Sequence, residues 1–364
     1  MRIFDIRKPN ENIKEAILQK IDNLNKPKGS LGRLETLAMQ ICLIQQSLTP
    51  QLIHPCHLLF GGDHGIEREG VSVSPRDVTW QQMYNFTKGG GGVNMFCRQH
   101  HFDLRIIDMG VDHDLTDNKD IINRKIARGT KNFLQEAAMS HEEFKKAIEI
   151  GADMAEKCHG EGCTIICMGE MGIANTSPSS VWMSLFGNIP LNECIGVGSG
   201  LDSPGVQHKK EILGKAVEHF KATAQDMELD VEHLHEAYGQ TNENILYAIR
   251  YFSGFEMAGT IGAMLRAAEL GMMIMVDGFI MSACMLAASR LCPEILHYAI
   301  FGHSGDESGH SRMLQIMRAK PLLQLGLRLG EGTGALCSYP IIESAVRMVN
   351  EMNNFENAKI TKYF

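Results

Sequence analysis

A turn at residues 329–334 combines a single carboxylate with a run of glycines. Glu331 stands between two glycines, and glycine tolerates positive φ angles and lets the backbone approach a ligand closely. A carboxylate held among apolar neighbours has a raised pKa and can act as a general base. The alternative is that the apolar run 322–329 is a helix ending on a glycine cap, with Glu331 merely solvated. The rest of the chain has to decide between these interpretations.

Six short apolar runs predict strands, because each has the length of a strand that is buried on both faces. These runs are Cys56–Phe60, Leu104–Ile107, Thr164–Met168, Cys194–Val197, Met272–Val276 and Tyr298–Phe301. Helical stretches separate them, and a repeated strand, glycine turn and helix is typical of an α/β fold with a parallel sheet flanked by helices. Ligands bind such sheets outside the carboxyl ends of the strands.

Polar, glycine-bearing turns follow all six runs. The turns are 61–65, 108–110, 169–176, 198–202, 277–278 and 302–303. If they gather at one edge of the sheet, their backbone N–H groups form a single cleft that suits a phosphate. The sequence therefore predicts a phosphate-binding cleft at this edge.

Other motifs are weaker. The four glycines at 89–92 predict a turn or a helix start, and no Gly-Lys-Ser/Thr follows them as a Walker loop requires. No strand leads into a full Gly-x-Gly-x-x-Gly, so we expect no dinucleotide cofactor. The basic loop at 26–35 is either solvated or in contact with a phosphate.

Composition excludes several classes of protein. The chain has 364 residues, a net charge of −8 and 44% hydrophobic residues, so we expect no nucleic-acid partner. No apolar run approaches the ~20 residues that span a bilayer, so no membrane association is expected. The ten cysteines form no Cys-x-x-Cys pair, and the mixed-charge N-terminus does not resemble a signal peptide. These features predict a reduced, cytoplasmic protein.

Two domains are expected. Residues 1–50 have helical periodicity, and residues 338–352 form a last amphipathic helix. We predict a small helical domain from residues 1–50 plus 338–364, and a large α/β catalytic domain from residues 51–337. Within the large domain, the charged stretch 111–160 has helical spacing, and a helix at 254–270 is rich in small residues and suits close packing.

Seven motifs, in order along nearly the whole chain, resemble one family: the nicotinate-nucleotide:5,6-dimethylbenzimidazole phosphoribosyltransferases, which activate the lower ligand of cobamides. The motifs are Lys-Pro-Lys-Gly-Ser-Leu-Gly at 26–32, Gly-Asp-His-Gly-Ile at 62–66, Glu-Gly-Val-Ser-Val-Ser-Pro at 69–75, Gly-Glu-Met-Gly-Ile-Ala-Asn-Thr at 169–176, Gly-Ser-Gly-Leu-Asp at 198–202, Val-Asp-Gly-Phe-Ile at 276–280 and Arg-Leu-Gly-Glu-Gly-Thr-Gly-Ala at 328–335.

The resemblance implies transfer of phosphoribose from nicotinate mononucleotide to an aromatic base, giving an α-ribosyl base 5′-phosphate and nicotinate. Glu331 matches the catalytic base, and Glu170 matches a second carboxylate at the reacting centre. The positions that match the phosphoribose site are Asn175, Thr176, Gly198, Ser199, Gly200 and Lys209. The positions expected to line the base pocket are Ser74, Gln82 and Leu329.

The resemblance also implies a Rossmann-like large domain, a small helical domain from both chain ends, a homodimer, and no metal or other cofactor. Such chemistry needs only carboxylates for proton transfer and charge stabilisation, with glycine turns and a lysine for the phosphate.

The chain departs from the family pattern at Gly305, where many members have a serine near the phosphate. The glycine run at 89–92 and the 22 methionines favour an adaptable base pocket. One branch of the family uses phenol or p-cresol and works as a heterodimer of two homologous chains, so two alternatives stay open. The alternatives to the main prediction are that the chain is a subunit of such a heterodimer, or that it is a catalytically weak partner within one.

A metal-dependent hydrolase is a rival from another class. Its candidate ligands are Asp63, His64, His303, Asp306, Glu307 and His310. Their spacing matches no zinc motif such as His-Glu-x-x-His, so we expect no bound metal.

Overall fold

The computed structural model describes residues 2–236 and 242–362. Its centre is a parallel sheet of six strands in the order β3-β2-β1-β4-β5-β6, the order of the Rossmann fold. The strands are β1 (Cys56–Gly62), β2 (Asp103–Gly110), β3 (Ile121–Asn123), β4 (Ile165–Met171), β5 (Met273–Val276) and β6 (Ala299–Phe301). The predicted fold class is therefore confirmed. The strand order reverses direction between β1 and β4, where such sheets bind ligands.

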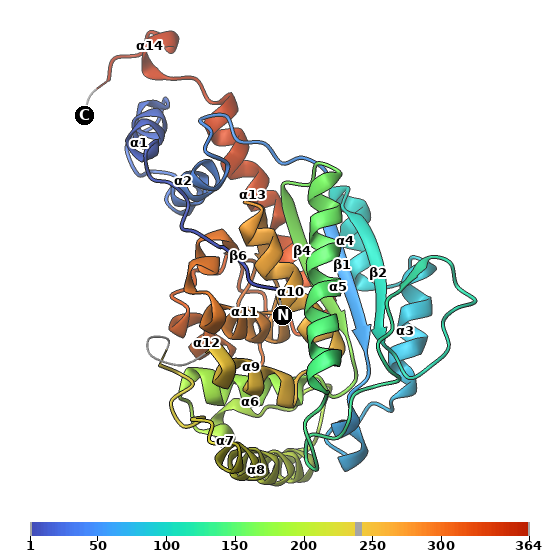
Figure 1. Ribbon diagram of the computed structural model, residues 1–364. Coiled ribbons are helices and arrows are strands. Elements are labelled where there is room, and N and C mark those ends of the chain that lie inside the picture. The colour runs from blue at the N-terminus through green and yellow to red at the C-terminus, as the bar shows by residue number, and fades with distance from the viewer. Residues whose placement is uncertain (1, 237–241, 363–364) are drawn as a thin grey trace.

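Helices cover both faces of the sheet (Figure 1). In the large α/β body they are η1 (Gly65–Glu69), α3 (Asp77–Thr87), α4 (Gly92–His100), α5 (His141–Gly160), α6 (Thr176–Gly187), α7 (Leu191–Cys194), α8 (Ser203–Asp226), α9 (Asn242–Phe252), α10 (Phe255–Glu269), α11 (Phe279–Leu291), η2 (Pro293–Tyr298) and α12 (His310–Ile316). Near the chain ends they are α1 (Lys14–Asn23), α2 (Arg33–Gln45), α13 (Thr333–Glu351) and α14 (Phe355–Ala358). None of these helices is long and apolar enough to cross a membrane.

Close packing between α5 and α10 supports the sheet from one face. A Cβ at Gly151 of α5 would lie 1.7 Å from the carbonyl oxygen of Gly259 in α10. The two backbones therefore touch, and only glycine fits at Gly151. The small-residue helix predicted at 254–270 is confirmed as α10, with its expected close contact.

The two chain ends meet in one helical region. Helix α2 packs on α13, Asn350 donates a hydrogen bond to the carbonyl of Pro50 at 2.8 Å, and Leu24 pairs with Asn354 as an isolated bridge. Figure 1 shows α1, α2 and α14 together at the outer end of α13, away from the sheet. The basic loop at 26–35 lies here, with the Lys26 ammonium 2.8 Å from the Glu35 carboxylate.

The division into residues 1–50 plus 338–364 and residues 51–337 stays a prediction. Helix α13 crosses its second boundary, because it begins at Thr333 and runs without a break to Glu351. The helix thus connects the helical region at the chain ends directly to the sheet.

Three predicted elements are wrong. The run 194–197 is not a strand: it follows the short helix α7, contains a glycine, and leaves the Val197 side chain 45% exposed. The sixth strand is instead β3, a three-residue edge strand beside β2 that lies within the charged stretch 111–160. The helical spacing of that stretch is confirmed only in its second part, which forms α5. The run 322–329 is not a helix, because Pro321 precedes it and Gly326 has φ +68°. Instead, Leu323 exchanges backbone hydrogen bonds with the segment after β6.

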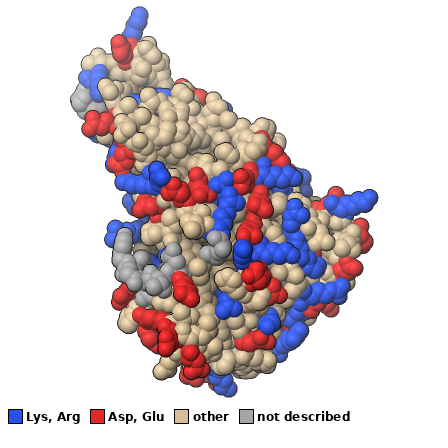
Figure 2. Space-filling model, viewed as in Figure 1, with Lys and Arg blue, Asp and Glu red and all other residues tan. Residues whose placement is uncertain are grey.

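The surface carries both signs of charge. On the face shown in Figure 2, Lys and Arg side chains alternate with Asp and Glu across the α/β body, while the helical region at the chain ends shows fewer charges. No extended basic surface is visible among the described residues on this face.

Candidate active site

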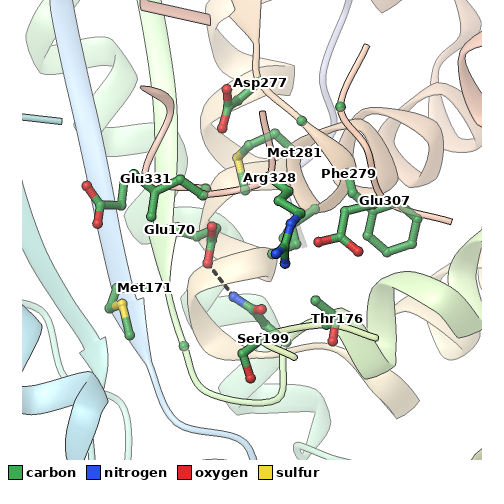
Figure 3. A pocket seen from close by; sticks show the side chains of 18 of the residues that line it. Glu170, Met171, Thr176, Ser199, Asp277, Phe279, Met281, Glu307, Arg328 and Glu331 are labelled. Carbon is green, nitrogen blue, oxygen red and sulfur yellow. Dashed lines mark hydrogen bonds between the residues drawn. The ribbon is translucent and has the colours of Figure 1, made fainter. Parts of the chain in front are cut away.

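A cavity of about 220 Å³ opens at the carboxyl edge of the sheet. Its walls come from the segments that follow β4, β5 and β6, together with the loop at 198–199 and the turn at 327–333. Several of the predicted glycine turns therefore do meet in one cleft. The turns after β1 and β2 are not among the described segments that line it. Figure 3 shows two carboxylates, Glu331 and Glu170, close together on one side of the cavity and Arg328 with Glu307 on the other.

Glu331 is held in a strained backbone turn. Its φ is +61°, and the flanking Gly330 and Gly332 have φ +89° and +83°. A non-glycine residue in this region costs free energy and persists only where its surroundings fix it. The side chain is 5% exposed, and its Oε2 accepts a hydrogen bond from the N–H of Val93 at 3.0 Å. The solvated interpretation of Glu331 is thus excluded.

Two opposing effects act on the pKa of Glu331. Burial raises it above its usual value, and the backbone N–H groups of Val93 and Gly92 lower it because they stabilise the carboxylate. The net result is a raised pKa. A carboxylate of this kind is a stronger proton acceptor than an exposed one.

Asp277 holds the turn that carries Glu331 in place through two hydrogen bonds. One carboxylate oxygen accepts the N–H of Gly332 at 3.1 Å, and the other accepts the N–H of Ala335 at 2.9 Å. Both N–H groups lie at the start of α13, where the helix itself offers them no acceptor. Asp277 therefore caps that helix and anchors the residue after Glu331. The His303 Nε2 lies 3.3 Å from Asp277 Oδ1. Sequence analysis had placed Asp277 in a turn but had given it no role.

Glu170 is the second carboxylate of the cavity. It lies near the end of β4 with 6% of its surface exposed, beside the point where the strand order reverses. Burial raises its pKa to about 8, and the Asn175 amide, which donates a hydrogen bond to it, opposes that rise. A pKa this high favours the protonated form of Glu170 at neutral pH.

Polar groups at the other end of the cavity suit an anion. Thr176 begins the twelve-residue helix α6, whose N-terminal N–H groups favour negative charge. The Lys209 ammonium, on α8, lies 2.7 Å from the Thr176 hydroxyl. Lys209 is 1% exposed, and burial lowers its pKa to about 8. The neighbouring Glu307 carboxylate favours the charged form.

Most of the predicted site residues line this cavity. Those that line it are Glu331, Glu170, Asn175, Thr176, Gly198, Ser199, Gln82 and Leu329. Lys209 lies behind Thr176, Ser74 lies beside the lining residue Ser72, and Gly200 follows the lining residue Ser199. These three are in the surrounding layer of residues.

Further lining residues were not predicted as binding residues. They include Met171, Phe279, Met281 and Arg328. Each stands within or beside a motif that was recognised, so position next to a strand end was the available signal. It was too general to single them out.

Gly305 also lines the cavity. Its N–H donates a hydrogen bond to Nδ1 of His310 at 2.9 Å. A Cβ there would lie 2.9 Å from the Leu327 carbonyl oxygen and 3.2 Å from both His303 and His310. The local packing of this chain therefore leaves little room for a serine at residue 305.

The proposed metal ligands do not form one cluster. Asp63 and His64 follow β1, where His64 Nε2 lies 2.6 Å from the buried Glu256 carboxylate. His303 and His310 lie in the segments after β6, with ring centroids 6.1 Å apart. Among the described residues, no three His, Cys, Asp or Glu side chains are arranged to hold a metal ion.

The fold and the site together define an α/β protein whose cavity places two buried carboxylates and a helix start suited to an anion in one space. Comparison with known proteins agrees with this class. A family model described as "Phosphoribosyltransferase" matches residues 6–360, and the chain belongs to this family. It is thus an enzyme of the glycosyltransferase type.

Relatives match over the full length. The chain is 57% identical over 364 residues to the nicotinate-nucleotide–dimethylbenzimidazole phosphoribosyltransferase of Bacteroides fragilis (strain ATCC 25285), covering 100% of both chains. It is 42% identical over 361 residues to the protein of that name from Dechloromonas aromatica (strain RCB), covering 99% of both. The crystal structure of CobT from Thermus thermophilus superposes with a TM-score of 0.87 at 29% identity, covering 96% of this chain and 99% of that one.

Proposed function

We propose that this enzyme transfers phosphoribose from nicotinate mononucleotide to an aromatic base, dimethylbenzimidazole first of all, and releases nicotinate. The observation that carries the proposal is the 57% identity over the whole chain to the Bacteroides fragilis enzyme of that name. The cavity supports it independently, because two buried carboxylates and an anion-suited helix start lie within one space.

Glu331 is the general base of the proposed reaction. A ring nitrogen of dimethylbenzimidazole attacks C1′ with its lone pair and with inversion, and the bond from C1′ to the nicotinate nitrogen breaks. The electron pair of that bond stays on the nicotinate nitrogen. The dimethylbenzimidazole ring then carries a positive charge, which is removed when Glu331 takes the proton from its N–H group. The raised pKa of Glu331 suits this transfer.

Glu170 responds to charge at the reacting centre. The bound nicotinate ring is positively charged, and the ribosyl carbon becomes positive as the bond breaks. Both charges favour the ionised carboxylate, so Glu170 loses its proton as the substrate binds and then stabilises the transition state. Its pKa of about 8 makes this change possible near neutral pH.

The phosphate is held at the far end of the cavity. The start of α6 at Thr176 and the loop with Gly198, Ser199 and Gly200 supply backbone N–H groups, and Lys209 supplies positive charge. In this proposal the acceptor base lies on the side of Glu331 and Met171 (Figure 3). Leu329 and Gln82 also line the cavity, and Ser74 is bonded to the lining residue Ser72. The working form is a dimer, either of two copies or with a homologous chain.

Turnover by the purified chain tests this proposal. The chain is incubated alone with nicotinate mononucleotide and dimethylbenzimidazole, and chromatography with mass spectrometry follows the riboside phosphate and nicotinate. Equal amounts of both products support the proposal. Nucleotide consumption without a riboside phosphate would overturn it. Activity that requires a second, homologous chain would assign this chain to a heterodimer, and light scattering on the active sample gives its assembly.

A further inference from the structure

The glycine run at 89–92 is a packed turn whose last residue begins α4. Asn94 ties it to the preceding helix: its Oδ1 accepts the N–H of Gly91 at 2.8 Å, and its Nδ2 donates to the carbonyl of Phe86 at 2.9 Å. The side chain is 7% exposed. A run that the sequence presents as loose is thus fixed by one buried amide.

The start of α4 points at Glu331. The Val93 N–H, which has no partner within its helix, donates to Glu331 Oε2 at 3.0 Å. The Gly92 N–H contributes a second interaction with that carboxylate. A Cβ at Gly92 would lie 2.9 Å from Leu329 Cδ2 and 3.3 Å from Glu331 Oε2. A methyl group there would press against the Leu329 side chain and the carboxylate, so glycine makes the close approach easier.

We propose that Asn94 is a positioning residue for Glu331, which it serves by aiming the amides of Gly92 and Val93 at the carboxylate. The Val93 amide holds Oε2, and in this proposal Oε1 takes the proton of the acceptor base. The positive end of the nine-residue helix α4 also favours the ionised form that a general base needs. This inference rests on the proposed role of Glu331.

Other titratable groups surround the turn that carries Glu331. They are Asp277 after β5, Glu170 and Cys167 on β4, His57 on β1 and His303 after β6. A substitution at Asn94 removes none of them. A change in the pH dependence of such a variant therefore reports on the amides of α4.

Asn94→Ala tests the inference through the pH profile of turnover. Without the anchor the amides hold the carboxylate less well, so the pKa of Glu331 rises and the acidic limb of kcat moves to higher pH. We expect a shift of about one pH unit and about a tenfold lower kcat at pH 6, because a hydrogen bond to a charged group is worth that much. KM for nicotinate mononucleotide should stay within about twofold.

Asn118→Ala is the matched control. Asn118 is half-buried, donates to the Thr87 hydroxyl at 2.9 Å and accepts the N–H of Asp120 at 3.0 Å. The Asn118→Ala variant therefore loses as many side-chain hydrogen bonds as Asn94→Ala, but Asn118 does not contact Glu331 or the amides that hold it. Its pH profile should match that of the parent. An unshifted limb in a folded Asn94→Ala would overturn the inference.

Asn94→Asp provides a second route if Asn94→Ala does not fold. The carboxylate still accepts the N–H of Gly91 but cannot donate to the Phe86 carbonyl, so the acidic limb of kcat should again move to higher pH while KM for the nucleotide stays near the parent value. A folded Asn94→Asp with the parental pH profile would also overturn the inference. The proposed function has a separate test: if Glu331→Gln keeps full turnover, Glu331 itself is wrongly assigned, whereas an inactive Glu331→Gln beside an unchanged Asn94→Ala rejects only the role of Asn94.

Discussion

The two ends of the cavity hold their functional groups in different ways. At one end, the carboxylate of Glu331 is fixed by backbone N–H groups, a helix start and a strained turn. At the other, charged side chains add to the N–H groups at the start of α6: Lys209 contacts Thr176, and Glu307 interacts with both Lys209 and Arg328. A backbone frame holds a reacting group in one place, which proton transfer requires. Side-chain charges can adjust to a flexible phosphate, for which affinity matters more than exact placement.

The largest effect is expected at the backbone-framed end. Glu331→Gln keeps the shape of the side chain and removes the base, so turnover should fall at least about a hundredfold. Binding of nicotinate mononucleotide should change little, because the phosphate end is intact. Stopped-time assays and calorimetric titration measure the two quantities. Unchanged turnover would reject Glu331 as the base.

A smaller effect, on affinity, is expected at the charged end. Lys209→Ala should weaken nicotinate mononucleotide about 10- to 100-fold, since a charge-assisted hydrogen bond contributes about 1.5–3 kcal/mol. Binding of the free base should be unaffected. Lys210→Ala, one residue along α8, is the matched control. If calorimetry finds equal nucleotide affinity in the Lys209 variant and the parent, the phosphate lies elsewhere.

Glu170 links the two ends and should affect stability. Its folded pKa of about 8 lies above the usual 4.5, so the folded state binds more protons than the unfolded state between these values. The contribution of Glu170 to the free energy of unfolding is therefore fully present below pH 4.5 and is lost as the pH rises to 8. Between about pH 5 and pH 8, the melting temperature of the parent should fall by a few degrees more than that of Glu170→Gln. Parallel melting curves across this range would contradict the raised pKa.

The smallest expected effect concerns the choice of acceptor. Dimethylbenzimidazole and p-cresol are both flat and apolar, and each methyl-sized difference discriminates by only about 1–3 kcal/mol. Met171 and Met281 line the cavity and can adapt to either ring. We predict that dimethylbenzimidazole is preferred but that p-cresol also turns over. A competition assay at equal concentrations measures the ratio, and a product mixture without any cresol riboside at high cresol concentration would refute the adaptable pocket.

The sequence predicted the sheet and the cleft because both depend on local patterns. Apolar runs such as those of β1 and β4 are readable one at a time, and glycine turns at their ends follow directly. Short elements were predicted wrongly because they show too little of such a local pattern. The three residues of β3 are too few to show a period, and the residues at 194–197 are apolar enough to imitate a strand.

Contacts between distant segments were beyond the sequence. The hydrogen bond from the Val93 N–H to Glu331 joins residues 238 positions apart, and the sequence near either residue does not predict it. The same holds for Asp277, whose two bonds to the start of α13 become visible only when β5 and α13 are placed side by side. The composition of the glycine run predicted a turn correctly, but it suggested looseness where Asn94 provides a fixed frame.

The helical region formed by both chain ends has a consequence for biosynthesis. The apolar faces of α1 and α2, with Ile17, Ile21, Leu37 and Ile41 buried in the finished protein, are made first. Their partner α13 is made about 300 residues later. Closing so long a loop is slow, and the early helices expose apolar surface until α13 has been made. The enzyme therefore depends on α13 twice, since this helix both completes the late-folding region and begins two residues after Glu331.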